Sequence, residues 1–192
     1  FAVIALLALA AACSTQKEPA TKAIADAETA LGAIRDDAGK FAASDLQSVE
    51  ATIADLKAKL QAGDYRGILA AAPDLTNRIA ALRDAVAAKK AELEAAIAKA
   101  QADWPALAAD LPNMLGALRS RVDALSASRR LPKNVSPAAF EAARNGLSTA
   151  QAAWDAATAA SASGDVVTAV AKAQEAKAAG SAAMSALGMT SG

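Results

Sequence analysis

The sequence predicts an all-α protein, organised as an elongated antiparallel helical bundle or an array of five to seven helices in hairpins. First, 60 of the 192 residues are Ala, the residue with the highest intrinsic helix propensity. Second, apolar residues recur at alternating spacings of three and four, which is the period of one helix face. Third, no segment shows the alternating β-branched and aromatic pattern of a strand.

The first two helices of the body are predicted from their apolar stripes and end signals. One stripe covers residues 24–41, and Gly39 is expected to end that helix as a C-cap. Ser44 followed by Gln47 has the spacing of a capping box, which predicts that the second helix begins there.

A Gly-Asp pair separates the second helix from the next one. Gly63 is expected to stop the second helix, and Asp64 to cap its successor. The following stripe covers residues 65–97, and Pro73 interrupts it without changing its register. Pro73 therefore predicts either a kinked helix or a short helix followed by a long one.

Two further signals divide the middle of the chain. Trp104-Pro105 predicts the end of the long helix or a kink in it. Asp110 to Pro112 predicts a new helix start, with Pro in the first turn. The stripe that follows ends near Leu125, and residues 126–136 form the longest predicted loop.

The remaining residues predict a C-terminal hairpin and a short polar tail. Ser136-Pro137 supplies an N-cap and a Pro at the first helical position. Gly164-Asp165 repeats the stop-and-cap pattern, and the final helix extends to residue 188, before the tail at 189–192.

The two predicted Gly-Asp hairpins resemble each other at an offset of 101 residues. Leu46, Val49 and Ile53 before the first turn correspond to Leu147, Ala150 and Trp154 before the second. The pattern indicates an internal duplication and is similar to one tetratricopeptide-like helical hairpin. The alternative is that any two Ala-rich helices joined by Gly-Asp look alike.

The first thirteen residues have the pattern of a bacterial export signal. Residues 1–12 carry no charge and are too few to cross a bilayer, which needs about 20 apolar residues. Small residues at Ala10, Ala11 and Ala12 stand directly before Cys13, the only Cys. This arrangement resembles the lipobox of bacterial lipoproteins, although Ala10 stands where Leu is usual. The chain begins with Phe rather than Met, so the basic part of the signal is expected upstream.

The lipobox resemblance implies how the chain is processed and where it resides. It implies cleavage between Ala12 and Cys13, and diacylglyceryl and N-acyl chains on Cys13. Ser14 after the Cys implies sorting to the outer membrane, facing the periplasm. The polar residues 13–19 then predict a short tether. A free or buried thiol at Cys13 is the alternative.

The body also carries cues of a broader family. Its cues are Trp104, Leu111-Pro112, Leu125-Ser126, Leu131-Pro132, Trp154, Gly164-Asp165 and Leu187-Gly188-Met189. With these it resembles uncharacterised Ala-rich proteobacterial lipoproteins, a resemblance that implies no activity.

Composition excludes much site chemistry. The chain has no His, so it lacks an imidazole base and a His metal ligand. One Cys cannot form an intramolecular disulfide or a multi-Cys zinc site. The 20 basic and 20 acidic residues balance, which gives no overall attraction to nucleic acid. We therefore predict no enzyme activity, no cofactor, no metal and no nucleic-acid partner.

The candidate binding residues are cations before and within the longest loop. They are Arg119, Arg121, Arg129, Arg130 and Lys133. They predict contact with lipid headgroups, lipopolysaccharide phosphate or peptidoglycan carboxylates. The alternative is a solvated helix end, where cations favour the helix dipole.

For the other candidate residues, a structural role is a simpler interpretation than a catalytic or binding role. Asp36-Asp37 and Glu92 with Glu94 are the nearest approach to carboxylate pairs, on faces predicted to be solvated. The two Trp residues, at 104 and 154, are expected to anchor helix packing rather than a ligand.

The domain organisation follows from these signals. Residues 1–12 form the signal, 13–19 the lipidated tether, 20–126 the N-terminal hairpins and long helix, 127–136 the basic loop, 137–188 the C-terminal hairpin and 189–192 the tail. The expected function is a lipid-anchored structural or protein-interaction module of the cell envelope, with an envelope protein as partner. The alternative is binding of lipid or another hydrophobic ligand by amphipathic helices.

Overall fold

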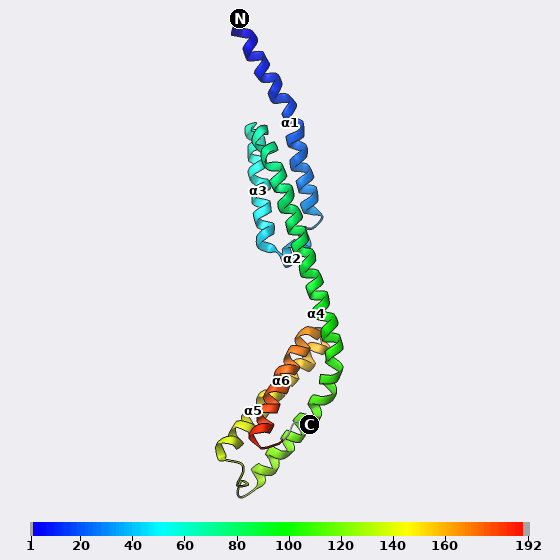
Figure 1. Cartoon of the computed structure of the whole chain (residues 1–192), viewed down its shortest axis with the longest axis vertical. Helices are drawn as coiled ribbons and strands as arrows, with labels where there is room; N and C mark the ends of the chain where they lie inside the picture. Colours follow the sequence, from blue (N-terminus) through cyan, green and yellow to red (C-terminus); the bar gives the residue numbers. More distant parts are fainter. Residues whose placement is uncertain (1, 190–192) are drawn as a thin grey trace. The chain divides into compact units, whose positions relative to one another are not determined.

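The computed structural model describes the backbone of residues 2–189 and the side chains of residues 15–189. This part of the chain forms six helices and no strand (Figure 1), which confirms the all-α prediction. The helices are α1 (Ala2–Gly32), α2 (Arg35–Phe41), α3 (Ala43–Ala62), α4 (Tyr65–Ala127), α5 (Pro137–Ala162) and α6 (Val166–Ala186).

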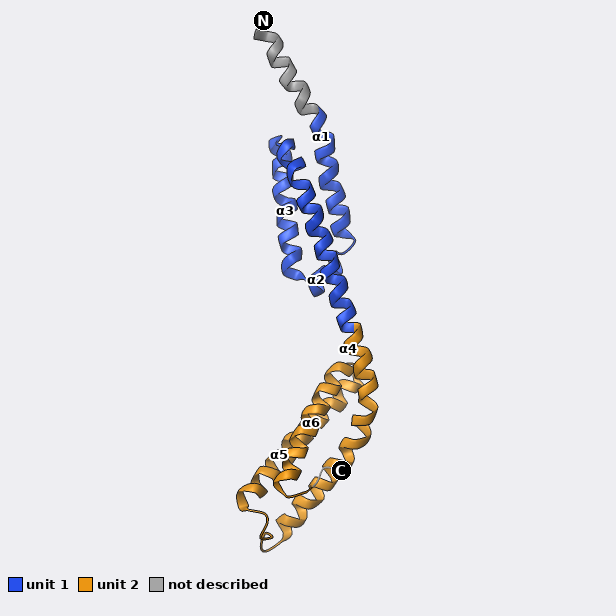
Figure 2. Cartoon of the chain, viewed as in Figure 1, with its two compact units in different colours: residues 1–93 blue, residues 94–192 orange. Residues whose placement is uncertain are grey.

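The chain divides into two compact units, and the division falls inside α4 (Figure 2). Unit 1 covers Phe1–Leu93 and unit 2 covers Glu94–Gly192. Helix α4 therefore contributes its first part to unit 1 and its second part to unit 2. Side chains 87–96 of α4 are all exposed.

The core of unit 1 lies between α1, α3 and the first part of α4. Apolar side chains at helical spacing on these three helices are buried together, and α2 adds the fully buried Ala38. The buried residues are Ala20, Ile24, Ala27, Leu31, Ala38, Val49, Ile53, Leu56, Ile68, Leu75, Ile79, Leu82 and Val86. Burial of these apolar surfaces is the main stabilising contribution.

The core of unit 2 lies between the second part of α4, α5 and α6, and has two clusters. One cluster joins the end of α4 to the start of α5 and the end of α6: Leu118, Val122, Leu125, Val135, Ala143, Ala183, Met184 and Leu187. The other cluster contains Leu111, Ala157, Ala173 and Ala176, with Trp104 and Trp154 packed against it. Helices α5 and α6 meet largely through small side chains.

Both Gly-Asp turns form as predicted. Gly63 and Gly164 have φ angles of 80° and 86°, the left-handed region that a Cβ disfavours. Asp64 accepts a hydrogen bond from the backbone N–H of Gly67 at 2.9 Å, and Asp165 accepts one from Thr168 at 3.0 Å. Ser136 likewise caps α5 through the N–H of Ala139, at 3.1 Å.

Two predicted helix ends near the start of the body are wrong. Helix α1 ends at Gly32, and Gly39 lies inside α2 rather than capping α1. Helix α3 begins at Ala43, and its N-cap is Ala42, whose side chain accepts no hydrogen bond from the helix. Ser44 therefore lies inside the helix and does not act as the N-cap. Tertiary burial of Ala38 positions α2 here and overrides the local end signals.

The predicted helix boundaries within residues 65–127 are also wrong. Helix α4 continues through Pro73, Pro105 and Pro112, so no helix ends at Pro73 or at Trp104-Pro105 and none begins at Asp110. The alternative of a kink at Pro73 or at Trp104-Pro105 stays a prediction. All three prolines are exposed. A Pro on the outer face leaves its unpaired carbonyl accessible to water, while the inner face of the helix remains packed.

The structure describes only part of the N-terminal segment in which the cleavage site, the lipidation site and the tether are predicted. Ala12 and Cys13, the predicted cleavage and lipidation residues, lie outside the side chains that the structure describes. Residues 15–19 of the predicted tether are exposed and belong to α1, which includes Pro19. Among the described residues, no helix combines the length and the apolar character needed to cross a membrane.

Candidate functional site

The connection between α4 and α5 is held in place by apolar side chains that point into unit 2. Helix α4 ends at Ala127, and residues 128–136 lead to α5. Val135 is only 3% exposed, and Leu131 packs against the same cluster. The N–H of Val135 donates a hydrogen bond to the carbonyl of Pro132 at 2.9 Å. The loop therefore has a defined inner side.

The cations of this loop face solvent. Arg129, Arg130 and Lys133 are exposed, and none of them forms an ion pair with a described residue. Arg129, Arg130 and Lys133 therefore present three positive charges to solvent, while Leu131 and Val135 hold the loop on the core of unit 2.

The two cations on α4 are not brought together by the structure. Arg119 donates a hydrogen bond to the side-chain carbonyl of Gln151 on α5, at 2.9 Å. Arg121 is half-buried. Because neighbouring helix positions are about 100° apart, Arg119 and Arg121 point to nearly opposite sides of α4. The five predicted residues therefore do not converge on one small ligand.

Charge is nevertheless separated along unit 2. We define its cationic end as residues 118–147 and 178–189, which surround the cluster at the loop end of the unit. This end holds six cations and two carboxylates, a net charge of +4, whereas the rest of unit 2 holds three cations and six carboxylates, a net charge of −3. The sixth cation, Arg144, forms an ion pair with Glu141 at 3.0 Å.

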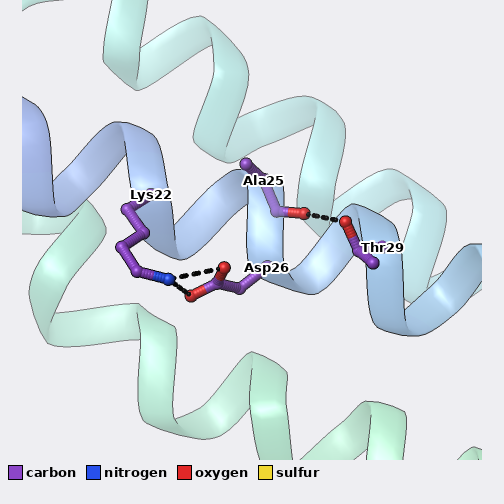
Figure 3. A network of polar contacts seen from close by, with 4 residues as sticks. All are labelled: Lys22, Ala25, Asp26 and Thr29. Carbon is purple, nitrogen blue, oxygen red and sulfur yellow. Dashed lines mark hydrogen bonds and ion pairs between the residues drawn. The ribbon is translucent and has the colours of Figure 1, made fainter.

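Many cations of unit 1, in contrast, have carboxylate partners. Figure 3 shows Lys22 donating to both carboxylate oxygens of Asp26, at 2.8 and 2.7 Å, one turn along α1. The Thr29 hydroxyl donates to the carbonyl of Ala25 on the same helix, at 2.8 Å. Lys57 pairs with Glu28 between α3 and α1.

The candidate carboxylate pairs do not form an acid–base site among the described residues. A hydrogen bond from Lys90 at 2.7 Å is the main factor that lowers the pKa of Asp37. A hydrogen bond from Lys89 lowers the pKa of Glu92. A general acid needs the opposite shift. One carboxylate of each candidate pair, Asp37 and Glu92, is therefore held in an ion pair with a Lys.

The Trp residues pack against each other. Their ring centroids are 5.9 Å apart, and the ring planes are inclined by 18°. Trp104 comes from α4 and Trp154 from α5, and both are half-buried against the second cluster of unit 2. This stack joins two helices, which is the packing role that the sequence predicts.

A groove in unit 1 was not predicted from the sequence. It has a volume of about 540 Å³ and lies between α1 and α4, lined mostly by Ala side chains with Ile34 and Ile79. Asp26 and Arg83 provide charge in its lining. Small residues on facing helices could have indicated it, because they leave space between the helix backbones.

Comparison with protein families, with curated proteins and with solved structures gives no match. In the part of the chain that the structure describes, no group of three or more Cys, His, Asp or Glu side chains is placed to hold a metal ion.

Proposed function

We propose that the chain is a lipid-anchored, non-enzymatic interaction module of a bacterial cell envelope. The observation that carries the proposal is the sole Cys, at position 13, directly after twelve uncharged residues that end in three Ala. The exposed polar residues 15–19 agree with a mature chain that begins at Cys13 and leaves the membrane there.

The chemistry of the described side chains favours binding over catalysis. No charged or polar side chain is buried among residues 15–189. The carboxylates with shifted pKa values, at Asp37, Glu92 and Asp165, are all shifted towards the charged form by hydrogen bonds. Such groups stabilise a surface and do not transfer protons near neutral pH.

The anchor is tested by replacing Cys13 with Ala in the full precursor, expressed with its native signal in a Gram-negative host. Wild type is expected in the membrane fraction and to incorporate labelled palmitate, whereas Cys13→Ala is expected to lose the label. Ser14→Ala is the matched control, because it changes the adjacent residue and keeps the thiol. Palmitate labelling of Cys13→Ala at the wild-type level would reject the anchor.

The groove between α1 and α4 favours a second candidate function, the binding of a hydrophobic ligand. Its volume of about 540 Å³ is within the range of small-molecule sites. Binding of a fluorescent fatty acid to the full chain tests it. Ala30→Glu places a charge in the groove and is expected to abolish binding, while Ala25→Glu, on the opposite side of α1, is the control. Equal binding by both variants would exclude the groove.

A further inference from the structure

We propose that the cationic end of unit 2 docks on the phosphate headgroups of an anionic lipid bilayer. The inference names a partner for the proposed envelope module and so rests on that function. Its docking surface consists of the three exposed loop cations, Arg129, Arg130 and Lys133.

The loop holds its cations exposed on a fixed backbone. Leu131 and Val135 fix the loop to the core of unit 2, so Arg129, Arg130 and Lys133 face solvent from a segment that has already lost much of its conformational freedom. Ordering a loop on binding costs entropy. A loop fixed at two inward positions loses less entropy when it meets a charged surface.

The loop cations lack carboxylate partners among the described residues. The three loop cations form no ion pair with any described carboxylate, and the cationic end has a net charge of +4. The opposite charge of −3 on the rest of unit 2 gives the unit a polarity. An anionic surface therefore attracts the cationic end and repels the other.

The type of partner follows from the exposure and the chemistry of these cations. Arg129, Arg130 and Lys133 all face solvent, whereas Arg119 and Arg121 point to nearly opposite sides of α4 and cannot both meet one flat surface. Two of the three loop cations are Arg, whose planar guanidinium donates two parallel hydrogen bonds to phosphate oxygens. No exposed aromatic lies among them to stack on a nucleic-acid base.

The cationic end exposes no large apolar side chain among the described residues. The exposed large apolar side chains among the described residues are Leu93 and Val167, and neither belongs to the cationic end. Binding is therefore electrostatic, at the level of the headgroups, without insertion. Basic residues near an anionic membrane each contribute about fivefold in partitioning. The effect decreases within a Debye length, which shortens to about 4 Å in 0.5 M salt.

The test is vesicle co-sedimentation of the purified full chain carrying Cys13→Ala, so that its outcome does not depend on lipidation. One set of vesicles contains phosphatidylcholine alone. The other contains phosphatidylcholine with about 30 mol% phosphatidylglycerol, so that about one lipid in three is anionic. The triple variant R129Q/R130Q/K133Q is compared with K40Q/R66Q/K177Q. The control removes three exposed cations that also lack an ion pair, and so makes the same change in net charge.

Phosphatidylglycerol is expected to increase binding of the parent chain, and the triple variant is expected to lose about a hundredfold of that increase. The control variant should keep most of it, and 0.5 M NaCl should abolish it. Circular dichroism verifies that both variants are helical. Equal loss in the two variants, equal binding to both vesicles, or sedimentation with carboxylate-rich peptidoglycan in place of vesicles would overturn the proposal. Any binding to vesicles of phosphatidylcholine alone is attributed to the apolar residues 1–12, and it is subtracted from the binding to the anionic vesicles. Loss of membrane anchoring in the Cys13 experiment leaves this result unaffected.

Discussion

Gly146 in α5 lies at a close contact between α5 and α6, and replacing it with Ala tests that packing. A Cβ added at Gly146 would lie 2.8 Å from the Cβ of Ala183 and 3.4 Å from the carbonyl oxygen of Ala179, both on α6. The Cβ of Ala183 has no rotamer by which to move away, so only a shift of the helices relieves the overlap. Such a shift would open the contacts of the fully buried Ala143 and Ala150.

The magnitude follows from two opposing effects. Replacing Gly by Ala inside a helix favours folding by about 0.8–1.0 kcal/mol. Overpacking a close contact costs about 1–3 kcal/mol. We therefore expect Gly146→Ala to reduce the free energy of unfolding by about 0–2 kcal/mol. In a unit of about a hundred residues this corresponds to a decrease in Tm of up to roughly 15 °C.

Gly116 and Gly180 provide matched controls in the same unit. A Cβ at Gly116 meets no atom within 4 Å, so Gly116→Ala should stabilise by the full helix-propensity gain. A Cβ at Gly180 meets the terminal methyl of Met114 at 2.6 Å, and this flexible side chain can move. Gly180→Ala should therefore lie between the other two variants.

Urea titration followed by Trp fluorescence measures the effect where it arises. The two Trp residues of the chain both lie in unit 2, as do all three glycines. The decisive quantity is the difference between Gly146→Ala and Gly116→Ala, expected to be about 1–3 kcal/mol. If the two variants are equally stable, α5 and α6 are not in close contact at Gly146 and the argument fails.

Three further predictions concern the helices. Pro105→Ala should raise the free energy of unfolding of unit 2, by up to about 3 kcal/mol, because α4 is continuous there and Ala restores a hydrogen bond; a decrease would show that Pro105 is needed for the local helix geometry. Trp154→Ala should cost about 3 kcal/mol by removing the stack on Trp104, measured by urea titration with circular dichroism, and a cost below about 1 kcal/mol would rule out an anchoring role. Hydrogen bonds from Thr168 lower the pKa of Asp165 below 3.8, so its charged form stabilises the fold fully above that pH, and the contribution is lost as the pH falls through the lowered pKa. Wild type should therefore lose more stability than Asp165→Asn between about pH 5 and pH 2, and equal losses would show that the charge at the cap has no role.

The sequence predicted those helix ends that depend on one or two neighbouring residues. Gly63 and Gly164 require left-handed backbone, and Ser136 and Asp165 supply cap oxygens, so their roles follow from local chemistry. The failures arise where packing decides. Gly39 remains helical because α2 buries the adjacent Ala38, which no local signal reports.

The candidate site was predicted by residue type and not by geometry. Nearness in the sequence grouped Arg119 with Arg121, but a helix separates residues two positions apart. The inward positions of Leu131 and Val135 depend on a core that α5 and α6 complete. Only the structure therefore shows that the loop is held on the core while its cations stay exposed.

The predicted internal duplication is tested better by comparing which positions are buried in the two hairpins than by comparing their residue types. Four buried residues of α4 in unit 1, Leu75, Ile79, Leu82 and Val86, correspond at the offset of 101 to Ala176, Gly180, Ala183 and Leu187, which are buried in α6 and at its C-cap. The corresponding residues are smaller at the first three positions, so unit 2 must obtain its core volume elsewhere. Its α4 segment provides it through Trp104, Leu111 and Leu118.

This exchange of volume explains why the two hairpins look alike in spacing and unlike in composition. The spacing of buried positions is set by the helix period and the Gly-Asp turn, which both hairpins share. Side-chain volume, in contrast, can move between facing helices as long as the interior stays filled. A common origin therefore predicts that α1 in unit 1 corresponds to the second part of α4 in unit 2, each being the helix that completes a hairpin core.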